Sequence, residues 1–323
     1  MITRQAFGTT ASGIPVEKIT LQAHGLTASF LTKGVTLQSV RLEGVAHDLT
    51  LGSDTLSDYE GKMRHHGSLV VPVVNRLSGG RARVNGAELA FERNQAGKHT
   101  LHSGAAGGQH KVWEIEQLTE THVTLGLRLP DGEGGFPGNR HIRARLSIGP
   151  GPALRMEVTA ETDAPTLFNA ANHSYWNLDG TETWAGHELR IAANHYLPTT
   201  EDFTPTGEIA PVAGAMDFRR GRVVTPEDTV LDTNFCLSGG RQALREVLWL
   251  RGRDGVSLTV ATTESGIQVY DARNAARPGR GFHEGLAIEA QAWPDAPNHP
   301  GFPAIDLRPG EPVTQVTEWR FNR

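Results

Sequence analysis

Residues 141–160 read HIRARLSIGPGPALRMEVTA, and their alternating pattern indicates the fold class. From residue 142 to residue 148 every second side chain is apolar, and the side chains between them are polar or charged. The alternation resumes at residues 154–160, after Gly149-Pro150-Gly151. Successive side chains of a strand point to opposite faces, so each run predicts a strand with one buried and one solvated face. The Gly-Pro-Gly turn between the runs predicts an antiparallel hairpin.

Outward from this hairpin, other segments carry the same signals. Residues 123–129 alternate in the same way, and residues 256–260 do so more weakly. Asn85-Gly86 lies between two short alternating runs and readily supplies the two residues of positive φ in a type I′ hairpin turn, and Asp254-Gly255 occupies the same kind of position. No long amphipathic helix stands out. We therefore predict an all-β fold, a large antiparallel β-sandwich.

The composition agrees with this fold and limits the classes of function. The 323 residues include 37 glycines and 18 prolines without a period, which indicates many tight turns. No linker or repeat divides the chain, so we expect one domain over residues 1–323. A net charge of −5 gives no electrostatic basis for nucleic acid or a membrane surface as a partner. The single cysteine, the lack of an apolar run long enough for a membrane span and the lack of a signal-peptide core predict a cytoplasmic protein.

The segment NHSYWN at residues 172–177 is the first candidate for a binding surface. If the chain is extended here, alternate residues share one face and form a polar, aromatic strip that can hydrogen-bond sugar hydroxyls. The alternative is that His173 and Tyr175 are ordinary core or surface groups, which is the more frequent situation for a single histidine. The residues predicted to share this face are Asn169, Ala171, His173, Tyr175 and Asn177.

The segment at residues 286–293 is the second candidate. Leu286, Ile288 and the alanines at 290 and 292 form an apolar face, while Glu289, Gln291 and Trp293 share the other face. A carboxyl, an amide and an indole on one strand face are more typical of a site than of packing. The alternative is that Glu289 simply lies on the solvated side of the strand.

Other residues that suggest ligands carry weaker signals. Asn75-Arg76 precedes the Asn-Gly hairpin, and His102 lies in the string LHSG at residues 101–104. The glycine-rich residues 104–108 lack the Lys-Ser/Thr and the helix of a phosphate-binding loop. The pairs His65-His66 and His99 with His102 have no third ligand at a convincing spacing, so we expect no metal site.

The order of these segments along the chain resembles that of the aldose 1-epimerase (galactose mutarotase) family. The resemblance covers nearly the whole length, and NHSYWN and EAQAWPDAPN are its most diagnostic strings. The matching strings are NR at 75–76, LHSG at 101–104, DGEGGFPGN at 131–139, NHSYWNLDG at 172–180, YLPTTEDFTPTGEI at 196–209, DTNF at 232–235, IEAQAWPDAPN at 288–298 and LRPGE at 307–311.

The resemblance implies a site and a reaction. It implies a large antiparallel β-sandwich with an open cleft, in which a small-molecule sugar changes between its α and β anomers without a cofactor. Glu289 matches the family's catalytic base, and His173 matches its catalytic acid. Sugar-binding positions fall on Arg76, His102 and Asp232, and Asn75, Tyr175 and Gln291 adjoin these positions in the matching strings.

The chemistry requires that a proton leave the C1 hydroxyl while another reaches the ring oxygen. We expect Glu289 as a carboxylate and His173 as an imidazolium, with the negative charge of Asp232 favouring the protonated imidazole. The open-chain aldehyde then rotates about C1–C2, and the ring closes on its other face. Arg76 and His102 are expected to hold hydroxyls of the sugar.

Three stretches depart from the family pattern, and we expect them to affect sugar recognition. They are VVPVV at residues 70–74, Thr233 in place of a histidine, and YDARNAARPG at residues 270–279. An epimerase that acts on phosphorylated sugars is therefore an alternative function, suggested by these changes and by the arginines at 219, 220 and 222. A non-catalytic sugar-binding protein on the same scaffold is a further alternative, and the oligomeric state stays open.

Overall fold

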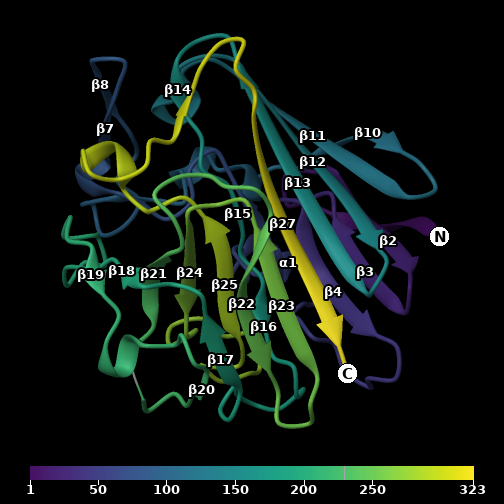
Figure 1. Cartoon of the computed structure of the whole chain (residues 1–323). Coiled ribbons are helices and arrows are strands. Elements are labelled where there is room, and N and C mark those ends of the chain that lie inside the picture. The colour runs from purple at the N-terminus through teal and green to yellow at the C-terminus, as the bar shows by residue number, and fades with distance from the viewer. Residues whose placement is uncertain (229) are drawn as a thin grey trace.

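The computed structural model describes residues 1–228 and 230–323, and strands dominate it (Figure 1). The largest sheet has nine strands and contains the 141–160 hairpin near its centre. Its strands, in spatial order, are β10 (Glu114–Leu118), β11 (His122–Leu129), β12 (Arg140–Gly149), β13 (Ala153–Thr162), β27 (Val313–Asn322), β23 (Ser257–Thr262), β22 (Arg245–Arg251), β17 (Glu188–Ile191) and β20 (Arg222–Val223).

Two further sheets accompany the nine-stranded sheet. A six-stranded sheet has the order β16 (Tyr175–Trp176), β25 (Leu286–Gln291), β24 (Gly266–Tyr270), β21 (Asp232–Cys236), β18 (His195–Tyr196) and β19 (Ala210–Pro211). A four-stranded sheet has the order β1 (Ile2–Thr9), β2 (Pro15–Ala23), β3 (Leu26–Leu31) and β4 (Thr36–Leu42). Neighbouring strands within all three sheets pair antiparallel.

Short elements make up the remainder of the described secondary structure. Four two-stranded pairs are β5 (Leu69–Val70) with β15 (Ala171–Asn172), β6 (Arg76–Leu77) with β9 (Thr100–Leu101), β7 (Arg81–Val84) with β8 (Ala87–Ala90), and β14 (Thr166–Leu167) with β26 (Asp306–Leu307). The α-helix α1 covers Leu56–Glu60, and 3-10 turns cover Ser78–Gly80, Gly104–Ala106, Gly108–His110, Glu133–Gly135, Gly214–Met216 and Ala296–Asn298. Among the described helices, none has the length and apolar character needed to cross a membrane.

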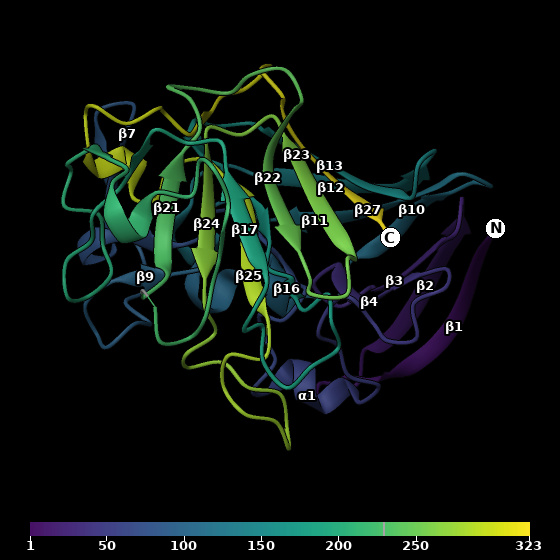
Figure 2. The same cartoon turned by 60° about the horizontal axis from the view of Figure 1, so that its bottom comes forward.

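The main core lies between the sheets, as the alternating pattern predicts. In Figures 1 and 2 the four-stranded and six-stranded sheets lie toward opposite sides of the molecule, and the nine-stranded sheet spans both. Inward side chains of all three sheets form one buried cluster. Trp176 of the six-stranded sheet packs against Trp319 and Phe321 of β27, with ring centroids 6.3 and 5.6 Å apart. The prediction of an antiparallel β-sandwich is confirmed.

The predicted hairpins occur, with one difference in a turn. Gly149 pairs with Ala153 across the Gly-Pro-Gly turn. Asn85 and Gly86 have φ angles of 49° and 83°, as a type I′ turn requires. The turn at Asp254-Gly255 is different, because only the glycine has a positive φ and the strands separate after the pair Arg251–Ser257. The hairpin there is real, but its loop is longer than the two-residue turn expected.

The prediction of one extended strand over residues 169–177 is wrong. The chain pairs first with β5 as β15 and then with β25 as β16, and it breaks at His173 and Ser174. Asn172 explains the break, since its Oδ1 accepts hydrogen bonds from the backbone N–H and the hydroxyl of Ser174, at 3.2 and 2.5 Å. Asparagine side chains that bond the backbone two residues further on favour turns over strands.

The contact between the sheets predicts the effect of truncating Trp319. We expect Trp319→Ala to lower the free energy of unfolding by about 3–5 kcal/mol, because it leaves a cavity where a fully buried indole packs on the other sheet. Chemical denaturation followed by circular dichroism measures this change. Leu118→Ala, at an exposed position of β10, is the control and should change stability by less than about 0.5 kcal/mol. Equal effects of the two substitutions would contradict this account of the core.

Candidate active site

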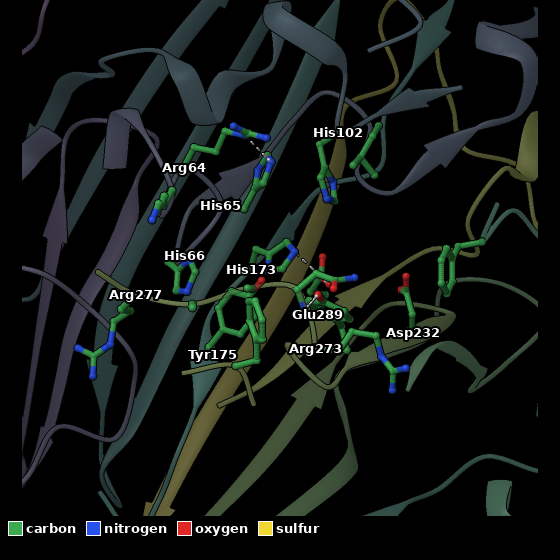
Figure 3. A pocket seen from close by; sticks show the side chains of 18 of the residues that line it. Arg64, His65, His66, His102, His173, Tyr175, Asp232, Arg273, Arg277 and Glu289 are labelled. Atoms are coloured by element: carbon green, nitrogen blue, oxygen red, sulfur yellow. Dashed lines mark hydrogen bonds and ion pairs between the residues drawn. The ribbon is translucent and has the colours of Figure 1, made fainter. Parts of the chain in front are cut away.

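One pocket brings together most of the site residues that the sequence analysis proposed (Figure 3). It has a volume of about 770 Å³, which is within the usual range for a small-molecule site. It lies on the face of the six-stranded sheet that turns away from the main core. Seven of the eight proposed residues line it: Asn75, Arg76, His102, His173, Tyr175, Asp232 and Glu289.

Strand register places the acidic groups on this face. In β25, Ile288 points into the main core, so the next residue, Glu289, points to the opposite face. Gln268 of β24 is directly opposite Glu289 across the ladder. Its Nε2 donates to Oδ1 of Asp232 on the next strand, at 2.6 Å. The register of three adjacent strands therefore positions both carboxyl groups.

His173 reaches the pocket because the chain leaves the strand there. The backbone N–H of His173 donates to Ser68 and its carbonyl accepts from Gly67, at 2.8 and 2.9 Å. Asn172 Nδ2 donates to the carbonyl of Gly67 at 2.7 Å. Gly67 has a φ of 70°, and a β-carbon there would lie 2.2 Å from the carbonyl oxygen of Leu37, so only glycine fits. These contacts fix the backbone on both sides of the imidazole.

Glu289 and His173 form a close, buried pair. Nε2 of His173 lies 3.6 Å from Oε1 of Glu289, and the two side chains are only 7% and 3% exposed. Glu289 Oε2 and His173 Nδ1 are buried and have no hydrogen-bond partner among the described residues. Buried polar atoms of this kind are usually satisfied, so atoms left without a partner inside a pocket mark a place for a ligand.

The charge states of this pair differ from those expected from the sequence. Burial raises the pKa of Glu289 well above its ordinary value; the negative charge of Asp232 raises it further, while Arg76 opposes the rise. Burial lowers the pKa of His173 to about 4. Removal of water disfavours the charged form of each group. Both shifts favour the uncharged forms, a carboxyl beside a neutral imidazole with one proton on the pair, over the ion pair expected from the sequence.

Asn75 and His102 lock each other in place across the pocket wall. The backbone N–H of Asn75 donates to Nδ1 of His102 at 3.1 Å, and the backbone N–H of His102 donates to the carbonyl of Asn75 at 2.9 Å. Both residues have positive φ angles, 62° and 52°, a strained conformation that the mutual bonds hold. Because Nδ1 accepts, the proton of this imidazole is on Nε2, which is left as a donor.

Arg76 connects this wall to the acidic side of the pocket. Its Nη2 lies 3.3 Å from Oδ2 of Asp232, and its Nε donates to Oε1 of Gln95 at 3.0 Å. The guanidinium lies 5.3 Å from the centroid of the Phe203 ring. Arg76 and Asp232 are thus a fixed pair of donor and acceptor, both mostly buried, beside the carboxyl of Glu289.

Aromatic groups form the opposite wall. Tyr175 stacks on His66 with ring centroids 4.3 Å apart, and its ring centroid lies 5.1 Å from that of His173. Tyr270 also lines the pocket. Tyr270 and Gln268 were not among the residues predicted from the sequence, although both alternate along β24 in step with the site face and could have been found from that pattern. His65 and His66 were considered only as metal ligands.

Two residues expected near the site lie outside the pocket. Gln291 shares the strand face of Glu289 but is fully buried beyond the pocket, and its Nε2 donates to the carbonyl of Ala292. Trp293 packs on Phe302 in a second apolar cluster. On this strand face, Glu289 lines the site, whereas Gln291 and Trp293 are packed in the interior beyond it.

The departures from the family pattern fall in different places. Residues 70–74 and Thr233 are buried and do not line the pocket. Residues 270–279 do contribute to the pocket wall. Arg219 and Arg222 lie outside the pocket, and they pair with Asp217 and Asp228.

The part of the chain that the structure describes contains no group of three or more histidine, cysteine or acidic side chains arranged to hold a metal ion. The lone thiol, Cys236, is buried, and burial raises its pKa to about 12. A thiol with so high a pKa is a poor nucleophile near neutral pH.

The chain is similar to known proteins over nearly its whole length. A family model described as aldose 1-epimerase matches residues 17–320. The galactose mutarotase of Bos taurus is 33% identical, over 99% of this chain and 98% of its own length. The aldose 1-epimerase of Escherichia coli (strain K12) is 30% identical, over 96% of both chains.

Solved structures show the same fold. The aldose epimerase homologue from C. elegans superposes with a TM-score of 0.87 at 27% identity, covering 95% of this chain and 98% of its own. The galactose 1-epimerase from Lactobacillus acidophilus NCFM also gives 0.87, at 26% identity, covering 100% and 98%. From the sequence matches over nearly its whole length, the chain belongs to the aldose 1-epimerase family.

Proposed function

We propose that this protein is a mutarotase, which interconverts the α and β anomers of an aldose by opening and closing its ring. The observation that carries the proposal is the buried contact between Glu289 and His173 on the pocket wall, 3.6 Å apart. Ring opening needs one group that removes a proton and one that supplies a proton, and this pair holds one mobile proton. The family membership supports the same reaction.

In the productive form the mobile proton is on His173. Glu289 then removes the proton from the C1 hydroxyl while His173 donates its proton to the ring oxygen. The C1–oxygen bond of the ring breaks as C1 and its hydroxyl oxygen become an aldehyde. After rotation about C1–C2 the ring oxygen attacks the other face of the carbonyl, and both protons return. The pair ends in its starting state, so no external reactant is consumed.

The pocket offers complementary groups to the sugar hydroxyls. Nε2 of His102 and the guanidinium of Arg76 are donors, and Asp232 is an acceptor. Arg76 also favours the carboxylate form of Glu289, which the base requires. Fixed donors and acceptors of this kind hold the reacting atoms within reach of the pair.

The alternatives are weaker. A non-catalytic sugar-binding protein has no need to bury a carboxyl against an imidazole, which costs free energy. A glycoside hydrolase generally uses two carboxyl groups on either side of the bond that breaks. Here the second carboxyl, Asp232, is held by Arg76 and Gln268.

The proposal predicts large effects from each member of the pair. We expect Glu289→Gln and His173→Gln each to lower kcat by about 100- to 10,000-fold, because each removes one positioned proton transfer. Polarimetry of freshly dissolved α-anomers of glucose and galactose measures the rate, after subtraction of the spontaneous reaction.

The matched control is Glu114→Gln, which changes an exposed glutamate of β10 outside the pocket and should leave the rate unchanged. Circular dichroism should show that all three variants fold. Full activity of Glu289→Gln, or tight sugar binding without acceleration by the unmodified protein, would contradict the proposal.

The shifted pKa values of His173 and Glu289 predict how kcat/KM depends on pH. The pKa of His173 is lowered to about 4, so below this pH the pair gains a second proton and Glu289 can no longer act as a base. The pKa of Glu289 is raised, so the pair keeps its proton through the range where a free carboxyl has lost it. We expect kcat/KM to be level near neutral pH and to fall as the pH drops through about 4. An acid limb near pH 6.5, the ordinary value for histidine, would contradict the burial argument.

A further inference from the structure

One corner of the pocket is lined by basic side chains. Lys62, Arg64 and His65 follow helix α1 and line the pocket. Figure 3 shows Arg64 and His65 near His173. The acidic side chains that line the pocket, Asp232 and Glu289, belong to the six-stranded sheet. A protein with a net charge of −5 thus places a local excess of positive charge at one end of its site.

His65 carries a donor without a partner. Nε of Arg64 donates to Nε2 of His65 at 3.3 Å, so Nε2 is the acceptor nitrogen of that ring and Nδ1 carries the proton. Burial, with the nearby His173 and Arg64, holds the pKa of His65 well below its ordinary value, which keeps the ring neutral. Nδ1 is buried, and it has no hydrogen-bond partner among the described residues. A buried N–H in a pocket wall is a donor that lacks its acceptor.

The charges of Lys62 and Arg64 are also unmatched. Other arginines of the pocket are neutralised by buried acids, since Arg273 pairs with Asp271 and Arg277 pairs with Glu284. Within residues 1–228 and 230–323, neither Lys62 nor Arg64 has a carboxylate within 4.0 Å. Arg273 and Arg277 are therefore held in ion pairs, whereas Lys62 and Arg64 are available to bind an anionic ligand.

The corner lies within reach of a sugar bound at the proton-transfer pair. The ring centroid of His65 is 6.0 Å from that of His173 and 4.8 Å from that of His102. A pyranose whose anomeric carbon is at Glu289 and His173 therefore has other substituents within reach of His65, which Arg64 contacts. The donors there suit a group with several negative oxygens, because guanidinium, ammonium and imidazole N–H groups all bond such oxygens well.

We propose that Lys62, Arg64 and His65 form a subsite for an anionic group, a phosphate monoester or a carboxylate, that the sugar carries away from its anomeric carbon. The inference rests on the proposed function, since it assigns the substrate class of the same pocket. Arg219 and Arg222, which suggested a phosphorylated sugar from the sequence, lie outside the pocket and cannot contact such a group there. The reaction at C1 is unchanged.

The test compares glucose, glucose 6-phosphate and glucuronate as substrates. We expect kcat/KM for at least one charged sugar to exceed that for glucose by about 10-fold or more, the size of a charge-assisted hydrogen bond. Arg64→Gln should bring this ratio close to one, and Arg64→Lys should restore part of it. The larger ratio identifies phosphate or carboxylate as the group recognised. Added salt should lower the ratio, since the corner is open to solvent.

Arg128→Gln is the matched control, because Arg128 is an exposed arginine of β11 outside the pocket, and it should leave the ratio unchanged. A ratio at or below one in the unmodified protein, or the same ratio in Arg64→Gln, overturns the subsite. Calorimetry gives a second measure that needs no turnover: the affinity for glucose 6-phosphate or glucuronate should exceed that for glucose, and Arg64→Gln should remove the difference. Acceleration of glucose with no preference for charge overturns the subsite alone, whereas charge-selective binding without acceleration of any sugar overturns the proposed function alone.

Discussion

Glu289 and His173 lie 3.6 Å apart with almost no access to water, and the remainder of the site depends on that contact. Burying a carboxyl and an imidazole separately is costly in free energy, because each loses its hydration. Placed together, they share one proton, so neither needs to carry a charge until a sugar arrives. This arrangement works only if both groups stay where they are, since a small displacement lets in water or separates the pair. The surrounding structure supplies that rigidity from two directions.

The carboxyl is held by a sheet and the imidazole by a break in a strand. Glu289 is in β25, where its neighbour Ile288 belongs to the packed core, so any shift of register would move the acid out of the pocket. His173 follows Asn172, whose amide bonds Gly67 and Ser174 and turns the chain out of its strand. His173 lies just before β16, where pairing with β25 begins. The imidazole therefore takes its position from the turn and not from strand pairing. The sheet thus holds Glu289 on a regular strand, and a break in a neighbouring strand holds His173 beside it.

Much of this could be predicted from the sequence, and the remainder could not for physical reasons. Period-two alternation identified the strands because burial of one face is a local property. The meeting of His173 with Glu289, 116 positions later, depends on which strands pair, and alternation carries no information about that. The family resemblance supplied the residues but not their charge states, which depend on burial. Gln291 was placed at the site because it shares a face with Glu289, yet the pocket ends before it.

The pocket divides into a part that performs the reaction and a part that can vary. The reacting pair and Asp232 are positioned by strand register and by the turn at Asn172. Residues 271–279 and residues 62–65 lie in connections between strands, where side chains can change without moving the ladder. Of the three departures from the family pattern, only the stretch at 270–279 reaches the pocket. Substrate preference can therefore vary through these connections while the strands that position the reacting pair stay unchanged.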